Sequence, residues 1–488
     1  MATKLSLANL PLLPASVAGP SYRRADLSPG IVHVGVGNFH RAHQAMYLHR
    51  LFETGRDRDW AIVGAGVKPY DASMRDRLKA QDWLTTVVEL DPEGFSATVC
   101  GSMIDFAEID PAALVETMAR PEIRIVSLTV TEGGYYVDAK TGGFDAGHPE
   151  IVADRENPDD PKTVFGILIA ALMKRRAAGV APFTVMSCDN LPENGHVARN
   201  AVLGLAQGRT GDVHDWIAEN VAFPCGMVDC ITPATGPREI DLVAGKFGIE
   251  DAAPVVCEPF RQWVLEDDFP QGRPALETVG VEFVDDVAPY ELMKLRILNG
   301  GHATIAYPAA LLGIHFVHEA MANPLVTGFL EKLEFTEIIP TVPEIPGVSL
   351  EGYYRKVVER FSNEAVGDTI PRLCLDGSNR QPKFILPTIA ARLAAGRPVD
   401  GLALEVALWC RYCAGTDEAG NPVTIDDIAA ERLGRLALAA RADPSAWLSM
   451  HDIFGNLNEN AAFAGAFASA LGSLWARGTE ATLAEYLK

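Results

Sequence analysis

The sequence has few of the features of a membrane, nucleic-acid-binding or disulfide-stabilised protein. It contains 42 Lys and Arg against 64 Asp and Glu, a formal net charge of −22, so it offers no excess of basic side chains to nucleic acid or anionic lipid. No apolar run approaches the ~20 residues that a membrane-spanning helix needs. The eight cysteines are scattered through 488 residues. We therefore expect a globular, cytoplasmic protein without nucleic-acid or membrane partners.

The sequence also lacks a convincing metal site. Its one CxxC pair, Cys410 and Cys413, lies in a stretch typical of a helix and has no second pair, which favours packed thiols over a zinc or redox centre. His40 and His43 are spaced as helix neighbours but have no nearby carboxylate or thiolate. We therefore expect chemistry that needs no metal.

What is present is an alternation of strand and helix signals in the first half of the chain. Short β-branched runs, with helical stretches between them, occupy residues 31–37, 60–67, 123–131 and 182–188. Beyond residue 285 the pattern is helical, at 291–312, 318–333, 353–362, 387–395, 402–413, 425–440 and 460–476. This predicts an α/β protein in which a Rossmann-like, doubly wound sheet domain (1–285) precedes a mainly helical domain (286–488).

A glycine turn follows the first predicted strand. The segment Gly35-Val36-Gly37-Asn38-Phe39-His40 has the first two glycines of a GxGxxG motif, with His40 in the third place. Glycines let the backbone bend tightly and approach a pyrophosphate, and the helix that follows presents oriented N–H groups. We predict a dinucleotide site here.

The second predicted strand should end near an acid that binds the ribose hydroxyls of the cofactor. Asp71 lies about five residues past Gly66 and is the candidate. Lys68 lies closer and would suit the 2′-phosphate of NADP. The pattern favours NAD, and leaves tolerance of NADP open.

The helical half contains Lys294-x4-Asn299-x2-His302. On an α-helix these three side chains project into one half of the circumference, where they can surround one small molecule. A desolvated lysine can accept a hydroxyl proton, an amide can hold the resulting alkoxide, and a histidine can bond a neighbouring hydroxyl. The overlapping Tyr290-x3-Lys294 matches the YxxxK motif of short-chain dehydrogenases, but it lies beyond the sheet where that motif belongs.

Two further polar groups fit a site that binds a small polar molecule. Asn190 follows the last predicted strand, at the sheet edge where α/β proteins bind ligands, and could pair with Asn299 around an oxyanion. The segment 372–383, interpreted as one short loop, gathers the donors Arg372, Asn379, Arg380 and Lys383. Such donors suit a polyhydroxylated or carboxylated substrate.

With these motifs in view, the chain resembles the polyol-specific long-chain dehydrogenases almost from end to end. The resemblance covers GVGNFHRAHQ (35–44), SLTVTEGGY (127–135), TVMSCDNLPENG (184–195), VCEPFRQWVLED (256–267), the KxxxxNxxH segment and RLCLDGSNRQPKF (372–384). It implies a metal-free, NAD-dependent and often monomeric enzyme that oxidises D-mannitol at C2 to D-fructose.

The resemblance also implies a role for individual residues. Lys294 matches the general base, Asn190 and Asn299 the alkoxide-holding pair, and His302 a substrate-orienting residue. The remaining matches are given together: Arg372, Asp229 and Lys383 for substrate binding, Glu291 for a proton path, and Gly35, Gly37, Asn38, Phe39, Asp71 and Glu132 for NAD.

One position departs from the family pattern: Cys230 stands beside Asp229 where an arginine is usual. Substrate preference could have drifted, with Lys383 or Arg380 compensating. A D-arabinitol 4-dehydrogenase and a fructuronate reductase remain open as sister activities, and a non-catalytic NAD-binding sugar sensor as a different class. The intact Lys294, Asn299 and His302 argue against the sensor.

Overall fold

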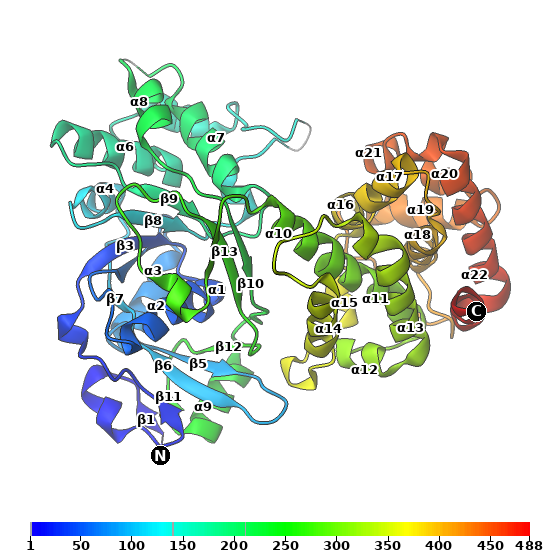
Figure 1. Cartoon of the computed structure of the whole chain (residues 1–488), viewed down its shortest axis with the longest axis horizontal. Helices are drawn as coiled ribbons and strands as arrows, with labels where there is room; N and C mark the ends of the chain where they lie inside the picture. Colours follow the sequence, from blue (N-terminus) through cyan, green and yellow to red (C-terminus); the bar gives the residue numbers. More distant parts are fainter. Residues whose placement is uncertain (1, 139–140, 210) are drawn as a thin grey trace. The chain divides into compact units, whose positions relative to one another are not determined.

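The computed structural model describes residues 2–138, 141–209 and 211–488 and divides into two compact units, residues 1–288 and 289–488 (Figure 1). The first unit combines sheets with surrounding helices, and the second is built from helices. The predicted fold class is therefore confirmed: a Rossmann-like sheet domain is followed by a mainly helical domain.

A five-stranded parallel sheet in the order β7-β4-β3-β8-β9 forms the centre of the first unit. The chain builds outward from β3 to β4 and β7, then returns to add β8 and β9 on the other side. The order thus reverses between β3 and β8, and ligands bind at such a switch point in open α/β sheets. The strands are β3 (Pro29–Val34), β4 (Ala61–Ala65), β7 (Met103–Phe106), β8 (Ile125–Leu128) and β9 (Thr184–Ser187).

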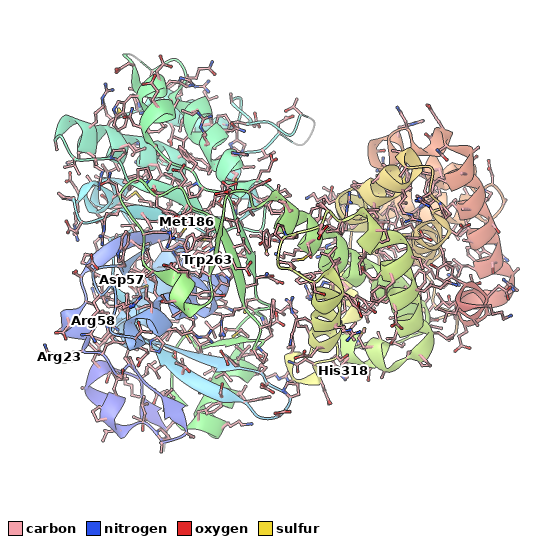
Figure 2. The ribbon with its side chains drawn as sticks, in the orientation of Figure 1. Arg23, Asp57, Arg58, Met186, Trp263 and His318 are labelled. Atoms are coloured by element: carbon pink, nitrogen blue, oxygen red, sulfur yellow. The ribbon has the colours of Figure 1, made fainter. Side chains whose placement is uncertain are left out.

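Successive strand residues enter two separate cores, one on each face of this sheet. Ile31 packs into one core and its neighbour Val32 into the other, as the period-2 alternation of a strand requires. The first core includes Met186 and Trp263, both labelled in Figure 2. Because both faces are covered, the strands are mainly apolar, with a few polar residues such as His33 and Ser127, and this made four of them recognisable in the sequence.

Helices complete the layers of the first unit. Buried residues of α4 and α6 pack in the same core as Val32, whereas those of α2 pack with Ile31. The helices of this unit are α1 (Asn38–Ala42), α2 (Gln44–Glu53), α3 (Asp71–Lys79), α4 (Pro111–Ala119), α5 (Pro149–Glu156), α6 (Val164–Ala177), α7 (Asn194–Ala206), α8 (Val213–Asn220) and α9 (Pro237–Phe247).

Three smaller sheets were not predicted. Their strands are short or paired over long sequence separations, so no single run of residues announces them. Their orders are β12-β5-β6-β2, with β12 (Val255–Cys257), β5 (Thr85–Glu89), β6 (Ser96–Cys100) and β2 (Val17–Ala18); β10-β13-β14, with β10 (Gly226–Asp229), β13 (Gln262–Glu266) and β14 (Glu282–Val284); and β1-β11, with β1 (Thr3–Lys4) and β11 (Ile249–Glu250).

The second unit begins within α10 (Ala288–Met293) and packs its helices around one another. Its helices are α11 (Gly300–Leu311), α12 (Val317–Ala322), α13 (Pro324–Leu333), α14 (Leu350–Phe361), α15 (Ile370–Cys374), α16 (Gly377–Phe384), α17 (Leu386–Ala394), α18 (Asp400–Cys413), α19 (Ala430–Ala440), α20 (Ser445–Leu448), α21 (His451–Phe454) and α22 (Ala461–Leu487). Cys410 and Cys413 are buried on α18, as the packed-thiol interpretation predicts. Within the described part of the chain, none of the helices has the length and apolar character needed to span a bilayer.

Several predicted helices have different bounds. The helix predicted at 318–333 is two helices, because Asn323 caps a new one at Pro324. The helix predicted at 425–440 begins only at Ala430. The single helix predicted at 291–312 is interrupted by a π-helical segment, Lys294–Asn299, between α10 and α11.

Glu405 is a buried acid inside the helical unit. It lies on α18, is fully buried, and accepts a hydrogen bond of 2.6 Å from the Gln381 side chain on α16. Burial raises the pKa of Glu405 to about 8. The group is therefore neutral in the folded protein at pH values where it would be charged in the unfolded chain.

We expect this acid to make stability fall as pH rises. Between the ordinary pKa of a glutamate and about 8, the folded state binds the proton more tightly than the unfolded state does, so stability is lost over that window at up to about 1.4 kcal/mol per pH unit. Glu405→Gln removes the ionisable group and with it this pH-dependent contribution to the free energy of unfolding. Denaturant unfolding from pH 5 to 8 should show the variant gaining stability over the wild type as pH rises. Parallel curves, like those expected for the exposed Glu480→Gln control on α22, would contradict it.

Candidate active site

The predicted glycine turn lies at the switch point of the central sheet. Gly35 has a φ of +98°, and a Cβ there would stand 2.0 Å from the Thr129 carbonyl oxygen after β8, so only glycine fits. Gly37 is exposed, and a Cβ on it would meet only the Gly35 oxygen, at 3.9 Å. Its backbone is thus open to a close ligand, as a pyrophosphate site requires.

The first turn of α1 is held from outside the motif. The Asn38 side chain donates to the Pro233 carbonyl and to the Thr235 hydroxyl, at 3.2 and 3.0 Å. Phe39 stacks on His43 with ring centroids 4.8 Å apart. Both side chains have structural partners, so contacts of these two residues with a cofactor would come mainly from the backbone.

His40, in the place of the third glycine, packs the helix against the sheet. Its ring stacks on His33 of β3 with centroids 3.4 Å apart, and both rings are buried. Burial lowers the pKa of each, that of His33 to about 3, so both rings are neutral at physiological pH. His33 Nε2 lies 2.9 Å from the Thr129 hydroxyl, which ties the ring to the glycine turn. No pattern in the sequence predicts this stack.

Asp71 closes the turn after β4, where the ribose acid was predicted. Its Oδ2 accepts hydrogen bonds of 2.9 Å from the backbone N–H groups of Val67 and Lys68. Gly66 is needed here because a Cβ would stand 2.4 Å from the Cβ of Asp71. The Asp71 Oδ1 has no hydrogen bond to any described residue and is available to a ribose hydroxyl.

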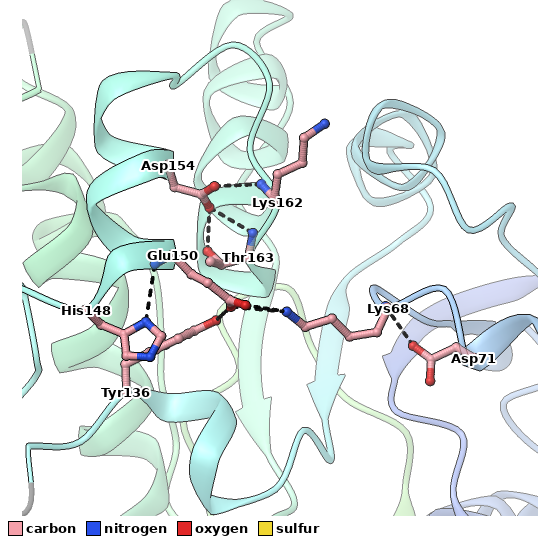
Figure 3. A network of polar contacts seen from close by, with 8 residues as sticks. All are labelled: Lys68, Asp71, Tyr136, His148, Glu150, Asp154, Lys162 and Thr163. Atoms are coloured by element: carbon pink, nitrogen blue, oxygen red, sulfur yellow. Dashed lines mark hydrogen bonds and ion pairs between the residues drawn. The ribbon is translucent and has the colours of Figure 1, made fainter.

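Lys68 is paired with an acid. Its Nζ lies 3.0 and 3.1 Å from the two carboxylate oxygens of Glu150, at the start of α5, and the Tyr136 hydroxyl donates to the same carboxylate at 2.5 Å (Figure 3). These bonds, first that of Tyr136 and then that of Lys68, lower the pKa of Glu150. The carboxylate offsets the charge that Lys68 would offer to a 2′-phosphate, which favours NAD.

Asp189 anchors the segment that contains Glu132. Its carboxylate, 9% exposed, accepts hydrogen bonds from the N–H groups of Val130 and Thr131 at 2.9 and 3.0 Å and from the Tyr135 hydroxyl at 2.7 Å. Thr131 has a φ of +66°, a region that costs a non-glycine residue about 1–3 kcal/mol. Asp189 thus holds a strained loop beside β8. The residue that directly follows it is Asn190.

The remaining predicted residues of the first unit lie near strand ends. Asn190 is exposed just after β9, and Asp229 is the last, buried residue of β10. Cys230 is buried next to Asp229, and it lies near Cys257, whose Sγ is 3.2 Å from an Arg261 guanidinium nitrogen. Arg261 therefore places a positive charge close to the position where the family pattern has an arginine.

The predicted catalytic segment of the second unit is not a regular α-helix. Lys294 and Asn299 are the two ends of the π-helical segment, so the angles derived from α-helical geometry were wrong. Lys294 is buried, with 7% exposure, whereas Glu291, Asn299 and His302 are half-buried. The His302 ring stacks on Phe361 of α14 with centroids 4.1 Å apart. π-Helical turns are frequent at functional sites because they re-aim side chains.

The donor-rich segment 372–383 is helical, which corrects the loop prediction. Arg372 belongs to α15, and Arg380 and Lys383 belong to α16. The Thr369 hydroxyl accepts from the Arg372 N–H and caps α15, and the turn signal of Asp376, whose φ is +55°, is confined to the short break between α15 and α16. Arg372 and Lys383 are exposed.

No group of three or more His, Cys, Asp or Glu side chains in the described ranges is arranged to hold a metal ion. The expectation of metal-free chemistry stays a prediction. Together the glycine turn at the switch point, the acid that closes the turn after β4 and the lysine segment are typical of one class: a dinucleotide-dependent dehydrogenase with a Rossmann domain and a helical domain.

Two family models together match most of the chain. The model of the mannitol dehydrogenase Rossmann domain matches residues 29–278, and that of the mannitol dehydrogenase C-terminal domain matches residues 286–475. A mannitol 2-dehydrogenase of Cereibacter sphaeroides is 57% identical over 474 residues, which cover 97% of this chain and 99% of the relative. The chain belongs to the mannitol dehydrogenase family.

Two solved structures resemble the chain over nearly its whole length. Mannitol 2-dehydrogenase of Pseudomonas fluorescens, in a ternary complex with NAD and D-mannitol, is 46% identical with a TM-score of 0.87 and 99% of both chains covered. A substrate-free D-sorbitol dehydrogenase is 37% identical with a TM-score of 0.92, covering 98% of this chain and 100% of the other.

Removing the charge of Asp189 should loosen the segment beside β8. Asp189→Asn presents an amide N–H to at least one of the three donors, and we expect a loss of about 1–3 kcal/mol in unfolding free energy together with a several-fold weaker NAD affinity. Tyr135→Phe, which removes one donor only, should give a smaller change in both. Denaturant unfolding and calorimetric NAD titration measure the two effects. Unchanged NAD affinity in a folded Asp189→Asn variant would refute the anchoring role.

Releasing Lys68 should widen cofactor use. Glu150→Gln removes the charge that offsets Lys68, and because exposed pairs are weak we expect a gain of three- to tenfold in kcat/KM for NADP relative to NAD. Glu116→Gln, which breaks the exposed ion pair with Lys174, is the matched control and should leave the ratio unchanged. Steady-state assays with both cofactors give the ratio. If both variants behave alike, Lys68 does not face the ribose.

Proposed function

We propose that this protein is an NAD-dependent polyol dehydrogenase that oxidises D-mannitol at C2 to D-fructose, reversibly and without a metal ion. The observation that carries the proposal is the 46% identity, over 99% of both chains, with a mannitol 2-dehydrogenase whose structure contains NAD and D-mannitol. The 57% identity with the Cereibacter sphaeroides enzyme supports it. We assign dinucleotide binding to the first domain (1–285), and the general base and most of the proposed substrate contacts to the second (286–488).

NAD, when bound, supplies a nicotinamide ring whose C4 accepts a hydride. Gly35 and Gly37 would give the pyrophosphate access to the backbone, and Asp71 Oδ1 would accept from a ribose hydroxyl. Glu132, exposed at the start of the loop that Asp189 anchors, is the candidate for a further contact with the cofactor.

Lys294 is proposed as the general base. As the neutral amine it removes the proton from the reacting hydroxyl while the hydride leaves the same carbon, so that an alcohol becomes a ketone. The burial of Lys294 keeps water from competing for its lone pair. Glu291, one turn earlier, would pass the proton on from Lys294 to solvent.

Asn190 and Asn299 are proposed to donate to the developing alkoxide. Amide donors aimed at an oxygen that gains charge stabilise the transition state more than the ground state, and this is what accelerates the chemical step. His302, fixed by its stack on Phe361, would orient the substrate through a neighbouring hydroxyl. Arg372, Asp229 and Lys383 would bind the remaining hydroxyl groups.

The test of this function is the formation of NADH at mildly alkaline pH with D-mannitol, D-arabinitol, D-sorbitol and D-mannonate. We expect the highest kcat/KM with D-mannitol, with D-fructose reduced in the reverse direction. D-Sorbitol belongs in the panel because of the 37% identity with a D-sorbitol dehydrogenase. Preference for D-arabinitol or D-mannonate would move the protein to a sister activity, and NAD binding without any turnover would leave the sugar sensor.

Loss of the base should remove most of the turnover. Lys294→Ala is expected to lower kcat for D-mannitol by about 10²–10⁴-fold, because that is the usual contribution of a general base. Circular dichroism and NAD titration show whether the variant keeps its fold and its cofactor site. A variant that retained more than a tenth of the wild-type kcat would show that Lys294 is not the general base.

A further inference from the structure

The carboxylate of Asp368 forms an ion pair with Arg372, the arginine that is proposed to bind substrate. Asp368 lies just before α15, with Thr369 between them, and its two oxygens accept from Nε and Nη2 of Arg372 in a fork-to-fork pair. The Asp368 side chain is 10% exposed and that of Arg372 is 48% exposed. Asp368 Oδ1 also accepts the Thr369 N–H at 2.8 Å. The acid is thus held from two sides, while the guanidinium reaches solvent.

The acid is ionised in this setting. Burial opposes its charge, yet the hydrogen bonds and the positive charge of Arg372, together with the electrostatic effect of the nearby His302, hold the pKa of Asp368 below its usual value. Asp368 therefore faces two residues that are proposed to contact the substrate, one on α15 and one on α11. Bidentate pairs of this kind fix geometry as well as charge.

The ion pair with Asp368 changes the hydrogen-bond donors and the net charge that Arg372 presents to a ligand. A guanidinium carries five N–H bonds, and two of them are used here, so three remain to donate to oxygen atoms. Its positive charge, however, is balanced by the acid at contact distance. A neutral hydroxyl needs only the N–H donors, whereas a carboxylate also needs the uncompensated charge.

The other cations nearby do not have this arrangement. Arg380 donates to the carbonyl oxygens of Arg372 and Leu373, at 3.3 and 2.9 Å, which orients it without balancing its charge. Asp376 accepts from Asn379 rather than from a cation. Arg372 is thus the basic side chain of the 372–383 segment that an acid holds in a bidentate pair.

We propose that Asp368 is a specificity-determining positioning residue, which neutralises Arg372 so that the site accepts an uncharged polyol and rejects the corresponding aldonate or uronate. The inference rests on the proposed function, because it takes Arg372 as a substrate-binding residue. It names the substrate class of that site: hydroxyl-rich and without a carboxylate. The donor-rich segment, which by sequence suited either class, is biased by Asp368 toward the neutral one.

The direct test is Asp368→Asn in the full-length enzyme. The amide keeps an oxygen for the Thr369 N–H but removes the charge that balances Arg372. We expect the ratio of kcat/KM for D-mannonate to that for D-mannitol to rise at least tenfold, mainly through a lower KM for D-mannonate. Asp368→Glu, which keeps the charge, should not show this rise. An unchanged ratio in a folded Asp368→Asn variant overturns the proposal.

Two further variants distinguish the loss of the Asp368–Arg372 ion pair from the effect of removing any negative charge. Asp452→Asn breaks the exposed pair with Arg432, 2.7 Å long and also in the helical unit, and should leave the ratio at the wild-type value. Asp368→Asn combined with Arg372→Gln should lose the gain, because the charge that attracts the carboxylate is gone. A gain that survives in the double variant, or that appears in Asp452→Asn, overturns the proposal.

Inhibition of the wild-type enzyme gives an answer that does not depend on any variant folding. D-Mannonate should inhibit D-mannitol oxidation with an inhibition constant at least tenfold above the KM for D-mannitol, and comparable values overturn the inference. If the wild type oxidises no polyol, the proposed function itself has failed. If it oxidises D-mannitol while Asp368→Asn leaves the ratio unchanged, only the role of Asp368 has failed.

Discussion

The close approach of two chain segments at the centre of the first unit governs the cofactor half of this protein. The Thr129 carbonyl lies so near Gly35 that no side chain can stand there, and the Thr129 hydroxyl bonds the Gly35 oxygen and His33. The turn after β3 is therefore locked to the segment after β8. Because the sheet order reverses between these strands, the same contact shapes the place where a dinucleotide binds.

Acids held by hydrogen bonds recur around the residues assigned to function. Asp71 closes the turn after β4, Asp189 anchors the loop of Glu132, Glu150 holds Lys68 and Asp368 holds Arg372. In two of these cases the acid balances a cation that would otherwise attract an anion. The excess of acids that gives the chain its net charge of −22 is thus also present beside these two cations. We expect the pair of Glu150 with Lys68 to favour NAD over NADP, and the pair of Asp368 with Arg372 to favour a polyol over its acid.

The sequence was most informative where periodicity and chemistry coincide. The four strands of the central sheet that were predicted are mainly apolar on both faces, because both faces pack into a core, and Gly35 is required by its backbone conformation. Such features are written in neighbouring residues. The π-helical turn at Lys294 was missed, because its residues have ordinary helix propensity and only the hydrogen-bond pattern distinguishes it.

Features that depend on residues far apart in the sequence could not be predicted from it either. The helix at Arg372 is capped by Thr369 in a segment that turn residues make look like a loop, and the stack of His40 on His33 joins a helix to a strand. Asp189 meets Tyr135 across 54 residues of sequence. No local pattern encodes these contacts, since they arise only when the sheet brings its strand ends together.

The central claim, hydride transfer from C2 of D-mannitol to NAD, is tested most directly with D-mannitol deuterated at both C2 and C5, because the molecule's symmetry makes the two carbons equivalent. The account predicts that each turnover yields D-fructose and NADH carrying deuterium at nicotinamide C4, both identified by NMR. NADH without deuterium, or a carbonyl product other than D-fructose, would contradict it.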